Sequence, residues 1–208
     1  IISIPNQESF QIGPRSFIDF YMNKIGVNSI QLNFPFPFNA QEKLKREMHN
    51  SLPLLDTFVR ELFLFYIKEI KDRNFYINPF QYVLFAVENF IVERRPCIFS
   101  RVCVENFMAI GPNGNCTLCD CWLEGDSEFI FGNLLKQNLD DIDRDRFREK
   151  IYKRTDRIIN EYCQSCPYIQ LCFGGCPVRT YGFYRDLYKK DFYCSVYKTM
   201  FDVAYGNY

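Results

Sequence analysis

The densest potential chemistry in the sequence is a run of closely spaced thiols, followed at a distance by one more: Cys163, Cys166, Cys172, Cys176 and then Cys194. Thiolates at short, ordered spacings are typical of a soft metal centre. The glycines and prolines beside them favour iron–sulfur or zinc ligation. The sequence therefore predicts a metal site that the other segments must position.

The remaining thiols lie upstream, and none precedes residue 96: Cys97, Cys103, Cys116, Cys119 and Cys121. Disulfide pairing is the alternative for 10 cysteines, but disulfide frameworks are typical of small secreted chains with little apolar material. Here 48% of 208 residues are hydrophobic. We therefore expect metal ligation, with either iron–sulfur clusters or structural zinc.

A glycine-containing turn at residues 110–115 separates Cys103 from Cys119. Such a turn predicts the tip of a β-hairpin, which would return Cys119 toward Cys97 and Cys103. Cys116 and Cys121 lie in the same hairpin segment, so either could replace Cys119 as a ligand. The simpler interpretation is that both are small packed residues or supporting thiols.

Over residues 97–194 this pattern resembles the SPASM domain, the C-terminal extension of many radical S-adenosylmethionine enzymes. Its cysteine spacing is similar to that of anaerobic sulfatase-maturating enzymes. The residues that match the motif are Cys103, Gly114, Cys119, Cys163, Cys166, Cys172, Cys176 and Cys194, with Cys97 as an extra ligand. The segments Phe131–Asn133 and Gly174–Pro177 resemble two further turns of the family.

The resemblance implies two auxiliary [4Fe–4S] clusters. A first cluster would be bound by Cys97, Cys103, Cys119 and Cys176. A second would be bound by Cys163, Cys166, Cys172 and Cys194. In sulfatase-maturating members an aspartate at the position of Asp120 is the proposed general base; the simpler interpretation is a hairpin aspartate that bonds local backbone amides.

Residues 1–93 contain no cysteine and show alternating strand and helix patterns. We expect strands at 1–5, 27–34 and 75–77, and helices at 14–25, 41–50, 53–70 and 79–92. Tight strand–helix–strand connections predict parallel strands and an α/β fold. Asn6 and Asn33, at the ends of expected strands, could face a cofactor.

By the resemblance, residues 1–93 are the C-terminal part of a partial (β/α)6 radical S-adenosylmethionine barrel, and residues 94–208 are the SPASM domain. A charged helix is expected at 143–162, with Phe147, Ile151, Ile158 and Ile159 on its inner face. Trp122 is expected in the core, and residues 184–190 in a solvated loop.

The Cys-x3-Cys-x2-Cys motif that binds the reducing cluster in this family is absent from the sequence. Because the chain also begins inside an expected strand, we expect it to be the C-terminal part of a longer enzyme. The resemblance implies that the missing part holds S-adenosyl-L-methionine and a third [4Fe–4S] cluster. No residue of this sequence is assigned to S-adenosyl-L-methionine.

The resemblance further implies a peptide or protein maturase that abstracts hydrogen with a 5′-deoxyadenosyl radical, as in sulfatase maturation or peptide crosslinking. Its auxiliary clusters would contact substrate and transfer electrons, with a flavodoxin- or ferredoxin-type donor. Alternatives are a stand-alone ferredoxin-like electron-transfer or peptide-binding module, and a zinc domain.

Charge and hydropathy give no sign of nucleic acid or membrane as a partner. The 25 basic and 25 acidic residues balance, and no run of eighteen apolar residues is present. We expect the cytoplasm as the compartment, because thiolates and clusters need a reducing setting.

Overall fold

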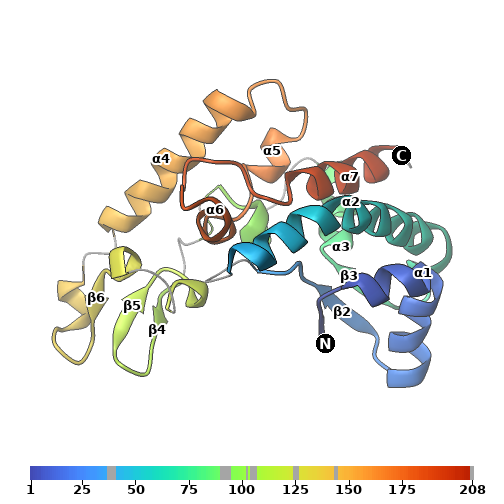
Figure 1. The fold of residues 1–208 in the computed structure, drawn as a ribbon, viewed down its shortest axis with the longest axis horizontal. Helices are drawn as coiled ribbons and strands as arrows, with labels where there is room; N and C mark the ends of the chain where they lie inside the picture. Colours follow the sequence, from blue (N-terminus) through green and yellow to red (C-terminus); the bar gives the residue numbers. More distant parts are fainter. Residues whose placement is uncertain are drawn as a thin grey trace. The chain divides into compact units, whose positions relative to one another are not determined.

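The computed structural model describes residues 1–36, 41–89, 95–101, 103, 107–123, 127–142 and 145–206 (Figure 1). These residues divide into two compact units. Unit 1 comprises the described residues within 1–36, 41–95 and 193–208, and unit 2 comprises those within 96–192. Unit 1 is therefore discontinuous in sequence, since its last segment follows unit 2.

A three-stranded parallel sheet lies at the centre of unit 1, in the order β1 (Ile2–Ser3), β2 (Ser29–Leu32) and β3 (Tyr76–Asn78). The parallel pairing confirms the predicted α/β class. The strand predicted at 1–5 is shorter than expected, since it spans only Ile2–Ser3, and within it Ile2 is 67% exposed while Ser3 is 5% exposed. Only one face of this strand meets the helices.

The helices of unit 1 are α1 (Gln7–Asp19) with its π-helical continuation η1 (Phe20–Ile25), α2 (Glu42–Phe65) with η2 (Tyr66–Ile70), α3 (Phe80–Asn89) and α7 (Cys194–Tyr205). The buried strand residues Ile30, Leu32 and Ile77 alternate with exposed ones, so the helices cover one face of the sheet (Figure 1). In the part of the chain that the structure describes, no helix is long and apolar enough to cross a bilayer.

Helix α1 begins earlier than the predicted residue 14. The Asn6 side chain accepts a hydrogen bond from the Ser9 N–H at 3.0 Å and caps the helix. Gly13, at φ +75°, and Pro14 then mark a kink inside the helical segment. The expected end at Gly26 is confirmed by its φ of +76°.

Helix α2 joins the two helices that were predicted at 41–50 and 53–70. Pro53 lies inside α2 and does not open a new helix. A proline removes one helical hydrogen bond, but the apolar side chains of Leu55, Phe58 and Leu62 are buried along the same helix. Tertiary packing therefore outweighs the local preference of proline for a helix start. The end of the helix predicted at 79–92 lies partly outside the described residues.

The core of unit 1 is rich in aromatic contacts. Phe63 of α2 and Phe80 of α3 stack with ring centroids 4.2 Å apart. Helix α7 packs against α2 and α3, and Phe201 of α7 is fully buried. The Tyr193 hydroxyl donates a hydrogen bond to the Pro35 carbonyl at 2.8 Å, which ties the start of α7 to the end of β2.

Unit 2 contains a small antiparallel sheet and short helices: β4 (Ala109–Ile110), β5 (Asn115–Thr117), β6 (Gly132–Asn133), α4 (Asp145–Tyr162), α5 (Ile169–Cys172) and α6 (Pro177–Tyr184). Short 3-10 turns complete it: η3 (Cys97–Phe99), η4 (Asp120–Trp122), η5 (Ser127–Phe129) and η6 (Leu139–Asp141). The hairpin β4–β5 confirms the predicted turn. Gly114 in that turn has φ +79°, and a Cβ there would lie 2.6 Å from Leu135 Cγ.

Trp122 confirms its predicted place in the core, since it is fully buried and stacks on Phe129 at 3.7 Å. Ile151 and Ile158 are buried as expected, and Ile159 is half-buried. The side chain of Phe147 lies outside the described residues. The solvated loop predicted at 184–190 is partly wrong, because Leu187 is 4% exposed and packs in the core of unit 2.

We expect Phe63→Ala to lower the free energy of unfolding by about 3–5 kcal/mol, because it opens a cavity beside Phe80. Leu54→Ala on the same helix is the matched control, since Leu54 is 54% exposed and should change stability by about 0.5 kcal/mol or less. Chemical denaturation followed by circular dichroism measures both. Equal effects of the two substitutions would contradict the assigned core.

Candidate metal centre

Five thiols of unit 2, from three separate segments, come together: Cys97, Cys103, Cys119, Cys121 and Cys176. They lie close enough that, in addition to burial, ionised neighbours raise the pKa of Cys103, which faces Cys97, Cys119 and Cys176. Cys97 also faces Cys119, and Cys121 faces Cys176. The structure thus brings together the four residues predicted for the first cluster and adds Cys121. Their ligation of a cluster stays a prediction.

Short turns position these thiols. Cys97 begins η3, Cys119 directly precedes η4, and Cys176 directly precedes α6. Helix α5 packs against η3, which brings the segment ending at Cys172 beside the segment that begins at Cys97. Four of the cysteines therefore lie at the ends of elements: Cys97, Cys119, Cys172 and Cys176.

The four thiols predicted for the second cluster lie between the end of α4 and the start of α7. The Cys163 N–H donates to the Ile158 carbonyl at 3.2 Å, and the Cys166 N–H donates to the Cys163 carbonyl at 2.9 Å. Cys172 is the last residue of α5, and Cys194 is the first residue of α7 in unit 1. The assignment of these four thiols to a second cluster stays a prediction.

The two thiols outside the family pattern differ in their surroundings. Cys116 is fully buried on β5, and its Sγ donates to the Gly114 carbonyl at 3.5 Å. Cys121 is half-buried, and its Sγ, the Cys119 Sγ and an Asp120 carboxylate oxygen lie within 4.8 Å of one another. Cys116 therefore fits the packed interpretation, whereas Cys121 lies among the candidate ligands.

Most of these thiols hold their protons strongly without a metal. Burial raises the pKa of Cys176 to about 11, and it also raises the pKa of Cys103. A hydrogen bond between Cys119 and Cys121, together with burial, raises the pKa of Cys119, and the same bond lowers the pKa of Cys121. Since a metal binds the thiolate, metal binding here must release protons.

Asp120 lies exposed beside this group. Its Oδ1 accepts a hydrogen bond from the Cys119 thiol at 3.2 Å. Within the described residues, the Asp120 carboxylate accepts no hydrogen bond from a backbone amide, which the simpler interpretation required. Its carboxylate is thus available to a molecule that approaches the thiols.

A glycine turn carries Cys176 into the group. Gly174 and Gly175 have φ of +84° and +73°, and a Cβ on Gly175 would clash with the Cβ of Asp191. The Cys176 N–H donates to Asp191 Oδ2 at 2.7 Å. Asp191 also pairs with Arg179 at 2.9 Å, and both side chains are buried. The turn therefore requires glycine for its conformation and for its close approach to Asp191.

Two buried arginines lie near the thiols, and neither was among the predicted site residues. Arg179 faces Cys97 and Cys176, and Arg154 faces Cys103, Cys172 and Cys176. Arg154 is spaced three residues after Ile151 and four before Ile158, so its place on the buried face of α4 was readable from helical periodicity.

This donor set fits an anionic metal–thiolate group. The predicted ligands are all thiols, and the sole histidine of the sequence, His49, lies in α2 of unit 1. Cysteine-only ligation suits [4Fe–4S] clusters and also structural zinc. The buried guanidinium groups supply positive charge that would offset the negative charge of metal-bound thiolates.

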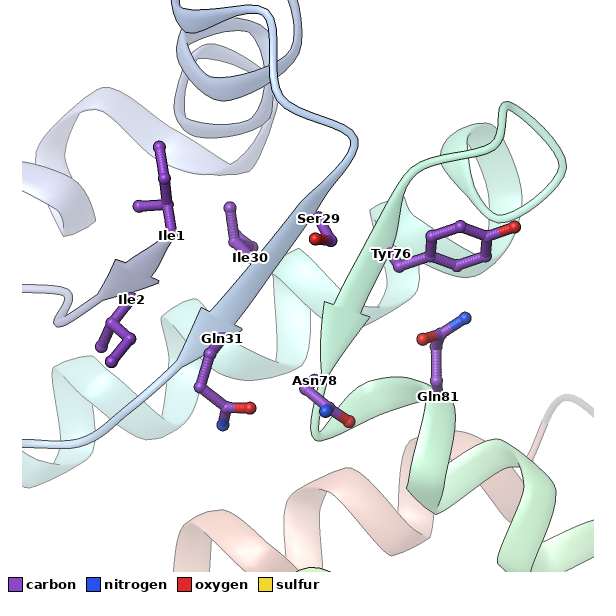
Figure 2. Close-up of a pocket in the computed structure, with 8 residues that line it drawn as sticks. All are labelled: Ile1, Ile2, Ser29, Ile30, Gln31, Tyr76, Asn78 and Gln81. Carbon is purple, nitrogen blue, oxygen red and sulfur yellow. The ribbon is translucent and has the colours of Figure 1, made fainter.

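A separate pocket of about 290 Å³ lies on the uncovered face of the unit 1 sheet. Figure 2 shows the amide side chains of Gln31, Asn78 and Gln81 near the carboxyl ends of β2 and β3. Asn6 instead caps α1, and Asn33 accepts a hydrogen bond from Gln31 at 3.2 Å. The Asn6 side chain is thus engaged in capping α1. Neither Asn6 nor Asn33 lines this pocket.

Comparisons with solved structures give the same fold over the whole chain. A native anSMEcpe structure with bound AdoMet and Cp18Cys peptide is 17% identical, with a TM-score of 0.71 over 100% of this chain and 55% of that chain. A hexahistidine-tagged anSMEcpe with bound AdoMet is 17% identical, with a TM-score of 0.75 over 100% and 52%. The chain thus spans about half the length of these structures. No curated protein matches it.

Residues 97–167 match the family model of SPASM, described as an iron–sulfur cluster-binding domain. Of the predicted ligands, Cys97, Cys103, Cys119, Cys163 and Cys166 fall within the matched segment, while Cys172, Cys176 and Cys194 follow it. The anSMEcpe structures belong to an anaerobic sulfatase-maturating radical S-adenosylmethionine enzyme. Residues 97–167 thus match an iron–sulfur cluster-binding domain, and the whole chain has the fold of part of the anSMEcpe structures.

Proposed function

We propose that this chain is the C-terminal part of a radical S-adenosylmethionine oxidoreductase that modifies a peptide or protein. The observation that carries the proposal is the convergence of five thiols, four of which lie within the segment that matches the SPASM model. Since the chain spans only about half of the solved structures, the activity would belong to the whole protein. S-adenosyl-L-methionine and a third [4Fe–4S] cluster would bind in its other part.

Unit 2 would contribute most of the ligands of two auxiliary [4Fe–4S] clusters. The first would be held by Cys97, Cys103, Cys119 and Cys176, and the second by Cys163, Cys166, Cys172 and Cys194. When bound, such clusters supply one-electron transfer. An external flavodoxin- or ferredoxin-type protein would be the electron donor, and the cytoplasm would provide the reducing setting.

Asp120 would act as a base toward the substrate. Its exposed carboxylate lies beside the Cys119 thiol, so a peptide group that approaches the first cluster would meet an oxygen able to accept its proton. A peptide as substrate is supported by the anSMEcpe structure, which holds a bound Cp18Cys peptide.

Two alternatives use the same thiols differently. A stand-alone electron-transfer or peptide-binding module would hold clusters without an S-adenosylmethionine site anywhere in the protein. A zinc domain would hold metal without sulfide. An upstream Cys-x3-Cys-x2-Cys segment in the same reading frame distinguishes the enzyme from the first alternative.

We expect anaerobically purified protein to hold about eight iron and about eight sulfide ions in these two clusters, four of each per cluster. Iron and sulfide analysis, with visible absorbance, measures this directly. A third [4Fe–4S] cluster in the other part of the enzyme would add about four iron and about four sulfide ions. Bound zinc without sulfide would rule out the proposed clusters.

We expect Cys119→Ala to remove about four iron ions, because Cys119 faces both Cys97 and Cys103 in the first set. Cys121→Ala is the matched control in the same turn and should retain the iron, since Cys121 stands outside the family pattern although it faces Cys119 and Cys176. Iron content and the electron paramagnetic resonance spectrum report the result. If only Cys121→Ala loses iron, then Cys121 and not Cys119 is the ligand of the first cluster.

We expect Asp120→Asn to lower the yield of modified peptide by about 10²–10⁴-fold while the iron content stays unchanged, because the amide cannot accept the proton. The full-length enzyme would be co-expressed with a candidate peptide encoded beside its gene, and the product measured by mass spectrometry. Asp140→Asn, at an exposed carboxylate of η6, is the control. Full activity of Asp120→Asn would remove Asp120 from the reaction.

A further inference from the structure

Arg154 of α4 is a charged side chain that is almost completely enclosed, with 1% of its surface exposed. Among the residues that the structure describes, its guanidinium donates only to neutral oxygens. These are the carbonyls of Leu187 (2.9 Å), Gly174 (3.2 Å), Gly175 (3.3 Å) and Lys189 (3.5 Å) and the Thr180 hydroxyl (3.2 Å). Within the described residues it forms no salt bridge. Its N–H groups are thus satisfied while its charge is not neutralised by a direct partner.

Arg179 provides the comparison within the same unit. It is 4% exposed, and it pairs with the buried carboxylate of Asp191 at 2.9 Å. A buried charge without such a partner is strongly unfavourable unless other charges of opposite sign lie near it. The buried position of Arg154 therefore calls for negative charge from another source.

The groups that face Arg154 supply that charge once the thiols are ligands. Burial lowers the pKa of Arg154, while Cys176, Asp191, Cys103 and Cys172 raise it by Coulombic attraction. Cys103 and Cys176 belong to the first predicted cluster, and Cys172 belongs to the second. Asp191 is already paired with Arg179. Metal-bound thiolates of both sets are therefore the anions left to balance Arg154.

Arg154 also holds the backbone that joins the two sets. Cys172 and Cys176 are separated by Phe173, Gly174 and Gly175, all three with positive φ. The guanidinium binds the carbonyls of both glycines from one side, and Asp191 binds the Cys176 N–H. Two charged side chains thus fix the turn: Arg154 binds the carbonyls of its two glycines, and Asp191 binds the N–H of the residue that follows them.

Given the two clusters of the proposed function, on which this inference rests, we propose that Arg154 is a positioning residue shared by both. It holds the turn between Cys172 and Cys176, and its fixed positive charge raises the reduction potentials of both clusters. One-electron reduction of either cluster adds one negative charge, supplied by the external donor in the cell or by dithionite in the test. A cation in a low-dielectric interior stabilises that added charge.

The test is a redox titration of the full-length, cluster-loaded enzyme with dithionite, followed by electron paramagnetic resonance. We expect Arg154→Gln to shift the midpoint potentials of both auxiliary clusters downward. Arg154→Lys keeps the charge and should leave both potentials near those of the wild type, although its thermal unfolding temperature should fall because it makes fewer hydrogen bonds. Iron content measured alongside reports cluster loading.

Arg157→Gln is the matched control, since it removes the same charge from the same helix. Arg157 is exposed and pairs with Glu161 at 2.6 Å. We expect it to leave both potentials unchanged.

Potentials in Arg154→Gln that equal those of Arg157→Gln would overturn the inference. A fall in Arg154→Lys as large as in Arg154→Gln would also overturn it, since geometry rather than charge would then be responsible. If Arg154→Gln does not fold, the lysine variant decides: retained potentials support the role of charge, and lowered ones contradict it. A wild-type enzyme without auxiliary clusters would overturn the proposed function as well, whereas loaded clusters with unaltered potentials overturn only this inference.

Discussion

The arrangement of unit 2 depends on the buried carboxylate of Asp191. This one group accepts the Cys176 N–H and pairs with Arg179, and it leaves no room for a side chain at Gly175. The backbone of Asp191 adds a hydrogen bond to the Gly174 carbonyl at 3.1 Å. Removing one partner of such a buried pair typically costs about 3–5 kcal/mol. The position of Cys176 is thus set by a polar network rather than by apolar contact.

The apolar core of unit 2 supports this network from the other side. Trp122 and Phe129 stack beside Leu118, Ile151 and Val178. Four thiols pack against this cluster: Cys103, Cys119, Cys121 and Cys176. Helix α4 contributes to both the apolar core and the polar network. Ile151 lies in the core, and Arg154, one turn later, binds the Gly174 carbonyl of the glycine turn. The core and the thiol site are therefore coupled through a single rigid helix.

Much of the fold was predictable from the sequence, as was the meeting of the first predicted set of thiols. Cysteine spacing, the Gly114 hairpin and the parallel strands are local patterns with few physical alternatives. The prediction missed features that depend on tertiary burial. Pro53 lies inside α2, where packing outweighs its local preference. The spacing of Arg154 from Ile151 and Ile158 places it on the inner face of α4, but its charge suggests solvent, and it is buried. No local rule shows that carbonyl groups and thiols distant in sequence surround that side chain.

The discontinuity of unit 1 has a consequence for synthesis of the protein. Helix α7 contributes Met200 and Phe201 to the core against α2, but residues 96–192 are translated before it. At about 5–20 residues per second, roughly 5–20 s separate the emergence of α3 from that of α7. During that interval α2 lacks α7, which later packs against it, while the cysteines of unit 2 leave the ribosome. The nascent chain therefore presents the cysteines of unit 2 to the cell before unit 1 can close.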